Sequence, residues 1–129
     1  MGERGHIGIV HSNNATPIYF YTHWEGHYVP TLLAEGLKRA MDAGRLDDES
    51  YATRIVFDCL TGCTGGTDSY GILIGEPQSD NEYAIPTVMW GQAGREPFVV
   101  YEDSRYSARD FITEFLPSSE QLTEQEQTV

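Results

Sequence analysis

A strand-forming stretch that ends abruptly is the feature of this sequence that most constrains its fold. Residues 18–24, Ile-Tyr-Phe-Tyr-Thr-His-Trp, are aromatic or β-branched at nearly every position, which is typical of a β-strand. Gly26 then breaks the strand, and Pro30 suits the first turn of a helix, because the N–H that proline lacks has no partner there. The chain is therefore predicted to pass from a strand to a helix between Trp24 and Pro30.

Further patterns predict the elements around this junction. Residues 6–11 form a first strand, and the polar turn after it makes a hairpin with residues 18–24 the simplest pairing. Two apolar stripes with helical spacing follow, and Asp47 and Asp48 are good caps for the second helix. The residues of the two stripes are Leu32, Leu33, Leu37, Ala40 and Met41, and then Tyr51, Ile55, Val56, Cys59 and Leu60.

Strand patterns return in the second half of the chain. Residues 69–75, 85–91 and 98–102 are separated by turn-forming runs, which predicts an antiparallel meander. A short amphipathic helix capped by Ser107 follows. The predicted order is β-β-α-α-β-β-β-α, an α+β fold with a mainly antiparallel sheet and the two helices of the helical pair on one face.

Length and composition favour one domain. The 129 residues are predicted to form a single α+β domain over 1–116, followed by an acidic, disordered tail over 117–129. Cys59 and Cys63 have a C-x-x-x-C spacing that matches neither a zinc site nor a redox motif. With no signal-like or bilayer-length apolar run, we expect a cytoplasmic protein.

The chain is strongly acidic, with a formal net charge of −12. This charge disfavours direct binding to nucleic acid through phosphates and to anionic membranes. Residues 61–129 carry 3 basic and 12 acidic side chains, so most of the excess lies in the second half. An acidic DNA-mimic inhibitor, acting through Glu76, Asp80 and Glu82, is therefore one open reading.

Two histidines and a glutamate near the strand end suggest a second reading, a small hydrolase or metalloenzyme. His23 and Glu25 point to the same side if the strand continues through them, and His27 can turn toward them. His11 is a possible fourth metal ligand. However, the spacing is not that of the H-E-x-x-H motif, and no nucleophile stands out. We predict no metal, no cofactor and no catalytic residue.

The aromatic cluster favours a third reading, a binding surface. Tyrosine and tryptophan beside histidine can anchor a protein partner or stack on a base, and Arg54 is the nearest candidate for a cation that faces a ligand phosphate or carboxylate. An aromatic strand at a sheet edge could alternatively form a homo-oligomer contact. The predicted binding residues are Tyr21, His23, Trp24, Glu25, His27, Tyr28 and Arg54.

The run from Tyr21 to Gly26, Tyr-Thr-His-Trp-Glu-Gly, resembles the Y-x-H-W-[DNE]-G signature of a family of small uncharacterised proteins from phages and actinobacteria. The resemblance extends over residues 1–100, through the Pro30 helix and the Asp47-Asp48 segment. It carries over no catalytic residue. It implies an accessory or counter-defence factor that binds a host protein or sequesters a nucleotide-like ligand, in the cytoplasm of the host cell if the gene is carried by a phage.

The element order is also similar to that of N-terminal nucleophile hydrolases. Those enzymes need an exposed Cys, Ser or Thr at the mature N-terminus, whereas this chain begins Met1-Gly2-Glu3. The similarity therefore concerns the fold alone. The leading prediction is a non-enzymatic binding protein.

Overall fold

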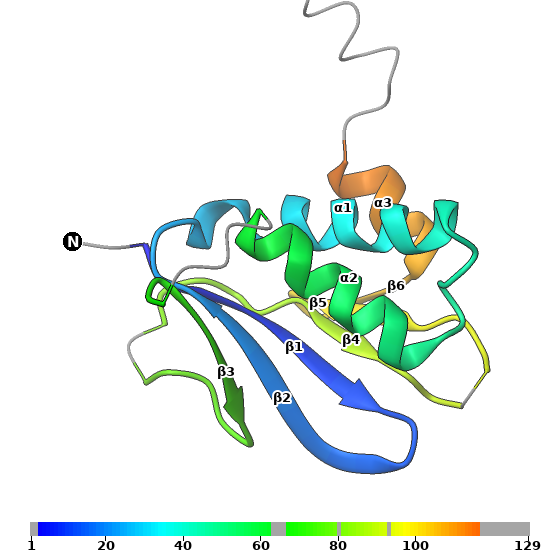
Figure 1. The fold of residues 1–129 in the computed structure, drawn as a ribbon, viewed down its shortest axis with the longest axis horizontal. Coiled ribbons are helices and arrows are strands. Elements are labelled where there is room, and N and C mark those ends of the chain that lie inside the picture. Colours follow the sequence, from blue (N-terminus) through cyan, green and yellow to red (C-terminus); the bar gives the residue numbers. More distant parts are fainter. Residues whose placement is uncertain (1–2, 63–66, 80, 93, 117–129) are drawn as a thin grey trace, which may run out of the picture.

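A computed structural model describes residues 3–62, 67–79, 81–92 and 94–116. Within these ranges a six-stranded sheet carries three α-helices on one face (Figure 1). The order β-β-α-α-β-β-β-β-α confirms the α+β class and adds one strand to the prediction. The predicted tail and Cys63 lie outside the described residues. No helix among those described is long and apolar enough to span a bilayer.

The strands lie in the order β3-β2-β1-β4-β5-β6. All neighbouring strands are antiparallel except β1 and β4, which are parallel. The predicted hairpin of the first two strands is present. The strands are β1 (Gly5–His11), β2 (Asn14–Thr22), β3 (Tyr70–Ile74), β4 (Thr87–Met89), β5 (Phe98–Tyr101) and β6 (Ser104–Ser107).

The prediction that residues 69–75, 85–91 and 98–102 form a meander is wrong for the first of these strands, β3. β3 pairs with β2 at an edge of the sheet, whereas β4 pairs with β1 in the middle. The connection between them crosses the helix-free face, where the buried ring of His6 on β1 binds it. The backbone N–H of Gln78 donates to Nε2 of His6 at 3.0 Å, and Nδ1 of His6 lies 3.0 Å from Oδ1 of Asn81. Only β4, β5 and β6 form a meander.

The added strand β6 follows a two-residue turn. Glu102 and Asp103 both have positive φ, 48° and 67°, as a tight hairpin of this hand requires. Glutamate is uncommon in that conformation, so the sequence does not signal the turn. The hairpin of β5 and β6 ends at Ser107, whose side chain accepts a hydrogen bond from the N–H of Asp110 and caps the last helix as predicted.

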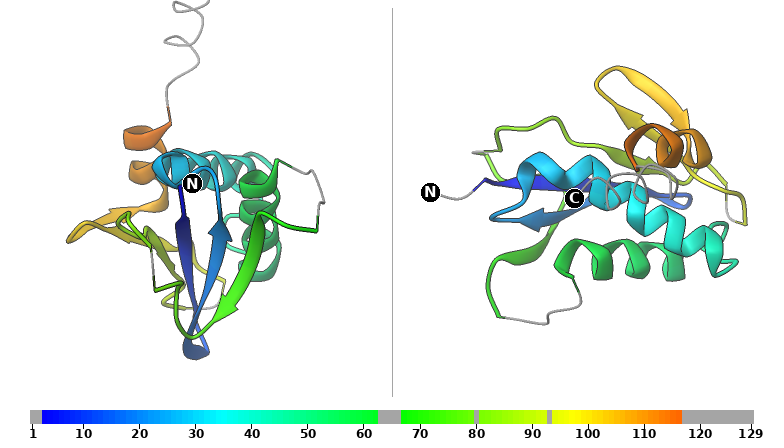
Figure 2. Two further views of the ribbon diagram at one scale, coloured as in Figure 1. Left: turned by 90° about the vertical axis from the view of Figure 1, so that its left-hand side faces the viewer. Right: turned by 90° about the horizontal axis from the view of Figure 1, so that it is seen from above.

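The three α-helices form one layer, with α1 packed between α2 and α3 (Figure 2). Asp48 caps α2 as predicted, since its side chain accepts from the N–H of Tyr51. Gly62 ends α2 with a left-handed φ of 62°. The helices are η1 (Gly26–Tyr28), a single 3₁₀ turn, α1 (Val29–Asp42), α2 (Glu49–Thr61) and α3 (Ala108–Phe115).

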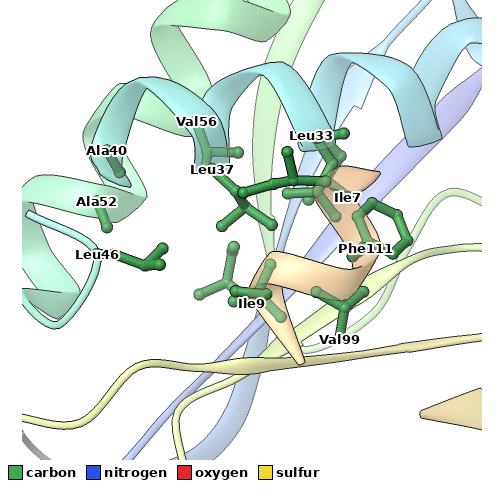
Figure 3. Packing of buried hydrophobic residues seen from close by; sticks show 14 of the residues in the cluster. Ile7, Ile9, Leu33, Leu37, Ala40, Leu46, Ala52, Val56, Val99 and Phe111 are labelled. Atoms are coloured by element: carbon green, nitrogen blue, oxygen red, sulfur yellow. The ribbon is translucent and has the colours of Figure 1, made fainter. Parts of the chain in front are cut away.

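The core lies between the helices and the sheet (Figure 3). Ile7 and Ile9 of β1 face Leu33 and Leu37 of α1, and all four are at most 1% exposed. Alternation along β1 sends His6 and Gly8 to the opposite face. The same alternation places Phe20 of β2 in the core and its neighbours Tyr19 and Tyr21 on the helix-free face.

Candidate functional site

The strand-to-helix junction is built on two glycines. Gly26 donates its N–H to the carbonyl of Glu3 at 2.8 Å. A Cβ atom on Gly26 would lie 2.8 Å from that carbonyl and 2.8 Å from the ring of Tyr83, and one on Gly5 would lie 2.6 Å from the Cα of Gly26. Only glycine fits this close approach, so the junction is held rigidly against the start of β1.

A first group of predicted residues forms a connected chain of rings. Nδ1 of His23 lies 2.9 Å from the hydroxyl of Tyr21, and the Nε–H of Arg4 donates to the same nitrogen at 3.4 Å. The ring of Trp24 stands edge-to-face on His23, with centroids 4.4 Å apart. The indole N–H of Trp24 donates to Oγ of Ser69 at 3.0 Å. Trp24 is thus held in one orientation although 55% of it is exposed.

A second group lies around η1. His27 forms an ion pair with Glu3, and the ring of Tyr28 packs on His27 with centroids 4.1 Å apart. Glu3 also bonds the hydroxyl of Tyr83, whose pKa is raised by burial and by Glu3 and Glu82. Glu25 belongs to neither group and lies near Tyr70 instead. The pKa of Tyr70 is raised by burial and further by the charge of Glu25.

His23, Glu25 and His27 are therefore not brought together. His23 contacts Tyr21 and His27 pairs with Glu3. His11, the possible fourth ligand, lies at the hairpin tip, with its Nδ1 3.3 Å from Oε2 of Glu49. Among the described residues, no three His, Cys, Asp or Glu side chains form a group that could hold a metal ion. The hydrolase or metalloenzyme reading gains no geometric support from this arrangement.

Arg54 also stands apart from the cluster. Its guanidinium forms an ion pair with Asp58, one turn further along α2. The acidic residues of the DNA-mimic reading are partly described: Glu76 and Glu82 are exposed, and Asp80 lies outside the described residues. That reading stays a prediction.

The outer edge of β3 is an open strand edge that the sequence does not reveal. β2 is paired on both sides, so it is not the edge that a homo-oligomer contact through the aromatic strand would need. The N–H of His23 bonds Ser69, and the N–H of Gly75 bonds Pro17. With this register, Gly71 and Leu73 bond β2, whereas Tyr70, Ile72 and Ile74 direct their N–H and C=O groups outward.

The side chains of β3 are also open. Ile72 is 55% exposed and Ile74 is 78% exposed, and no charge or proline interrupts the strand. Trp24 bonds Ser69, directly before β3, so it lies at the end of the same edge. We call Trp24, Ile72, Ile74 and the outward backbone of β3 the edge surface. A run of three aliphatic residues between Gly71 and Gly75 is its only sequence signal.

Comparisons with protein-family models, with curated proteins and with solved structures find no match for this chain.

Proposed function

We propose that this chain is a non-enzymatic binding protein that accepts an extended segment of a partner protein along β3. The observation that carries the proposal is the outward row of N–H and C=O groups at Tyr70, Ile72 and Ile74, beside exposed aliphatic side chains. An open, uncharged edge is a template for an added strand. Main-chain hydrogen bonds supply affinity in this mode, and side-chain contacts supply specificity.

Trp24 is the proposed anchor of the partner. Large aromatic side chains dominate many binding interfaces, because they bury much area at a low cost in conformational entropy. Contacts with His23 and Ser69 already hold the indole in place, so little further freedom is lost on binding. Tyr28, which is 56% exposed, lies on η1 after the same strand end and is a second exposed aromatic side chain at this junction.

Charges at the ends of β3 define the chemistry of the partner. Exposed Asp68 and Glu76 flank the strand, which favours a partner segment that is apolar and flanked by Lys or Arg. A second copy is disfavoured. Antiparallel pairing about a two-fold axis at Ile72 brings Asp68 of one copy near Glu76 of the other, and like charges repel in that position.

The family resemblance supplies the proposed context. A small acidic protein of phage type that binds through an edge strand would act on a host protein, as an accessory or counter-defence factor. Sequestration of a nucleotide-like ligand that stacks on Trp24 is the alternative that the resemblance leaves open.

A labelled peptide tests the proposal. The probe has a short β-branched core with two lysines on each side, and its binding is followed by fluorescence anisotropy. Trp24→Ala and Ile72→Asp should each weaken binding by about tenfold or more. Tyr51→Ala is the matched control, because Tyr51 is 50% exposed, close to the 55% of Trp24, but lies on α2.

The same core flanked by glutamates should bind much more weakly than the lysine-flanked peptide. Equal binding of the two peptides would contradict the proposed charge preference. Equal affinity of Trp24→Ala, Ile72→Asp and the original protein would place the binding surface elsewhere.

A further inference from the structure

A hollow of about 660 Å³ is lined by residues of the β4–β5 connection together with Asp47, Phe98 and Arg105. The β4–β5 and α1–α2 connections, which both contribute to the lining, lie at the end of the sheet opposite to η1 (Figure 1). Its volume is within the range of small-molecule sites. The side chains that matter for its chemistry are Asp47, Gln92, Arg95, Phe98 and Arg105.

The hollow brings together two arginines, Arg95 and Arg105, that form no ion pair in the part of the chain that the structure describes. The chain has eight Lys and Arg side chains, and Arg4 among them contacts His23. In the described part of the chain, Arg95 and Arg105 form no ion pair, yet both line this one hollow. The five cations in ion pairs are Lys38 with Asp42, Arg39 with Glu35, Arg45 with Asp48, Arg54 with Asp58 and Arg109 with Glu96.

Glu96, which also lines the hollow, is paired with a third arginine, Arg109. Both of its carboxylate oxygens are taken by Arg109, at 3.1 Å from Nε and 2.7 Å from Nη2. Arg105 is stacked over the ring of Phe98, with its Cζ 3.6 Å from the ring centroid. Stacking fixes the plane of the guanidinium and leaves its N–H edge available for a planar acceptor.

We propose that this hollow binds a small molecule that carries an oxyanion group, a phosphate or a carboxylate, between Arg95 and Arg105. Guanidinium groups match the paired oxygens of both anions. Asp47 lies on the same hollow and has no ion pair among the described residues, so it is placed to accept hydrogen bonds from donor groups of the ligand. The proposed ligand therefore combines an anionic group with hydrogen-bond donors, as a nucleoside monophosphate does.

This site is independent of the edge surface. The sequence suggested Arg54 as the cation that faces an anionic ligand. The proposed site instead uses Arg95 of the β4–β5 connection and Arg105 of β6. The sequence offers no sign of the pair, because only the fold brings Arg95 and Arg105 to one hollow.

Calorimetric titration of the full chain at low salt tests the inference, with inorganic phosphate, adenosine 5′-monophosphate and succinate as probes. We expect at least one probe to bind. Arg95→Gln and Arg105→Gln should each raise its Kd by about tenfold or more. Arg39→Gln is the control, because it removes an exposed arginine from α1 without touching the hollow. A thermal melt of each variant without ligand checks that it is folded.

The three probes also distinguish the sources of the anion. Preference for succinate indicates a carboxylate ligand, and preference for a phosphate probe indicates a phosphorylated one. Asp47→Asn should weaken the binding of adenosine 5′-monophosphate more than the binding of inorganic phosphate, because phosphate lacks the hydrogen-bond donors of the nucleoside. Absence of binding by all three probes would overturn the inference, and so would an equal loss of affinity in Arg39→Gln and Arg105→Gln.

Discussion

His6 shows at the scale of one residue how a buried polar side chain holds the sheet to its crossing connection. Nε2 accepts from the N–H of Gln78, so the ring proton of the neutral form is on Nδ1 and faces Oδ1 of Asn81. Both bonds suit the neutral ring. Burial lowers the pKa of His6, although the bond to Asn81 opposes this effect.

A defined pH dependence of stability follows. The pKa of His6 is lower in the folded state than its ordinary value of 6.5, so the unfolded chain binds more protons between the two values. The contribution of neutral His6 is therefore complete above pH 6.5 and is lost as the pH falls toward the folded pKa. Urea unfolding at a series of pH values should show a steeper loss of free energy below pH 6.5 in the original protein than in His6→Gln. Parallel curves would contradict this role.

Individual side chains differ in how far the sequence predicts their surroundings. Alternation along a strand is enough to place Tyr21 and His23 on one side, and the structure joins them by a contact of 2.9 Å. Their other partners are not predictable in this way. Arg4 lies 19 positions from His23 and Ser69 lies 45 positions from Trp24, so these contacts exist only because the strands pair as they do.

Glu49 connects two elements, the hairpin tip and the start of α2. Its carboxylate accepts from the hydroxyl of Ser12 at 2.5 Å and from the N–H of Ser12 at 3.0 Å, and it lies 3.3 Å from Nδ1 of His11. Burial raises the pKa of Glu49, but the bonds from Ser12 and His11 outweigh burial and lower it overall. The negative charge also lies at the positive end of the α2 dipole.

Removal of this connection should destabilise the fold. Glu49→Ala is expected to reduce the free energy of unfolding by about 1–3 kcal/mol at neutral pH, because it leaves the partly buried groups of Ser12 without their acceptor. Since the folded pKa is lowered, the contribution is present above the ordinary pKa of 4.5 and disappears as the pH falls below it. Glu35→Ala removes an exposed ion pair within α1 and should reduce the free energy of unfolding by no more than about 0.5 kcal/mol. Equal losses would contradict the linking role.

The elements themselves were predictable where local chemistry decides them. Apolar stripes and the caps at Asp48, Gly62 and Ser107 mark the helices, and the aromatic run marks β2. The position of β3 was not predictable, because a turn-rich connection is equally compatible with a hairpin and with a crossing. His6 and Asn81 stabilise the crossing, and they are 75 positions apart.

At the scale of the whole molecule, the two proposed sites involve opposite ends of one sheet. The junction that carries Trp24 precedes η1, and the β4–β5 connection that lines the hollow lies at the other end of the sheet (Figure 1). The net charge of −12 gives the protein a field that attracts basic partners and repels further copies of itself. Arg95 and Arg105 form no ion pair among the described residues, so the hollow can attract a small anion although the protein as a whole is acidic. The two proposals therefore concern separate surfaces, a protein partner at the edge surface and a small anion at the hollow.

Amide hydrogen exchange along β3 tests the central claim most directly. In the free protein, the amides of Tyr70, Ile72 and Ile74 should exchange rapidly, whereas those of Gly71 and Leu73, which bond β2, should be protected. Addition of the lysine-flanked peptide should slow exchange at Tyr70, Ile72 and Ile74 by about tenfold or more, because these amides gain acceptors in the added strand. Protection of all five amides before the peptide is added, or exchange at the outward three that does not change with a bound peptide, would contradict strand addition at β3.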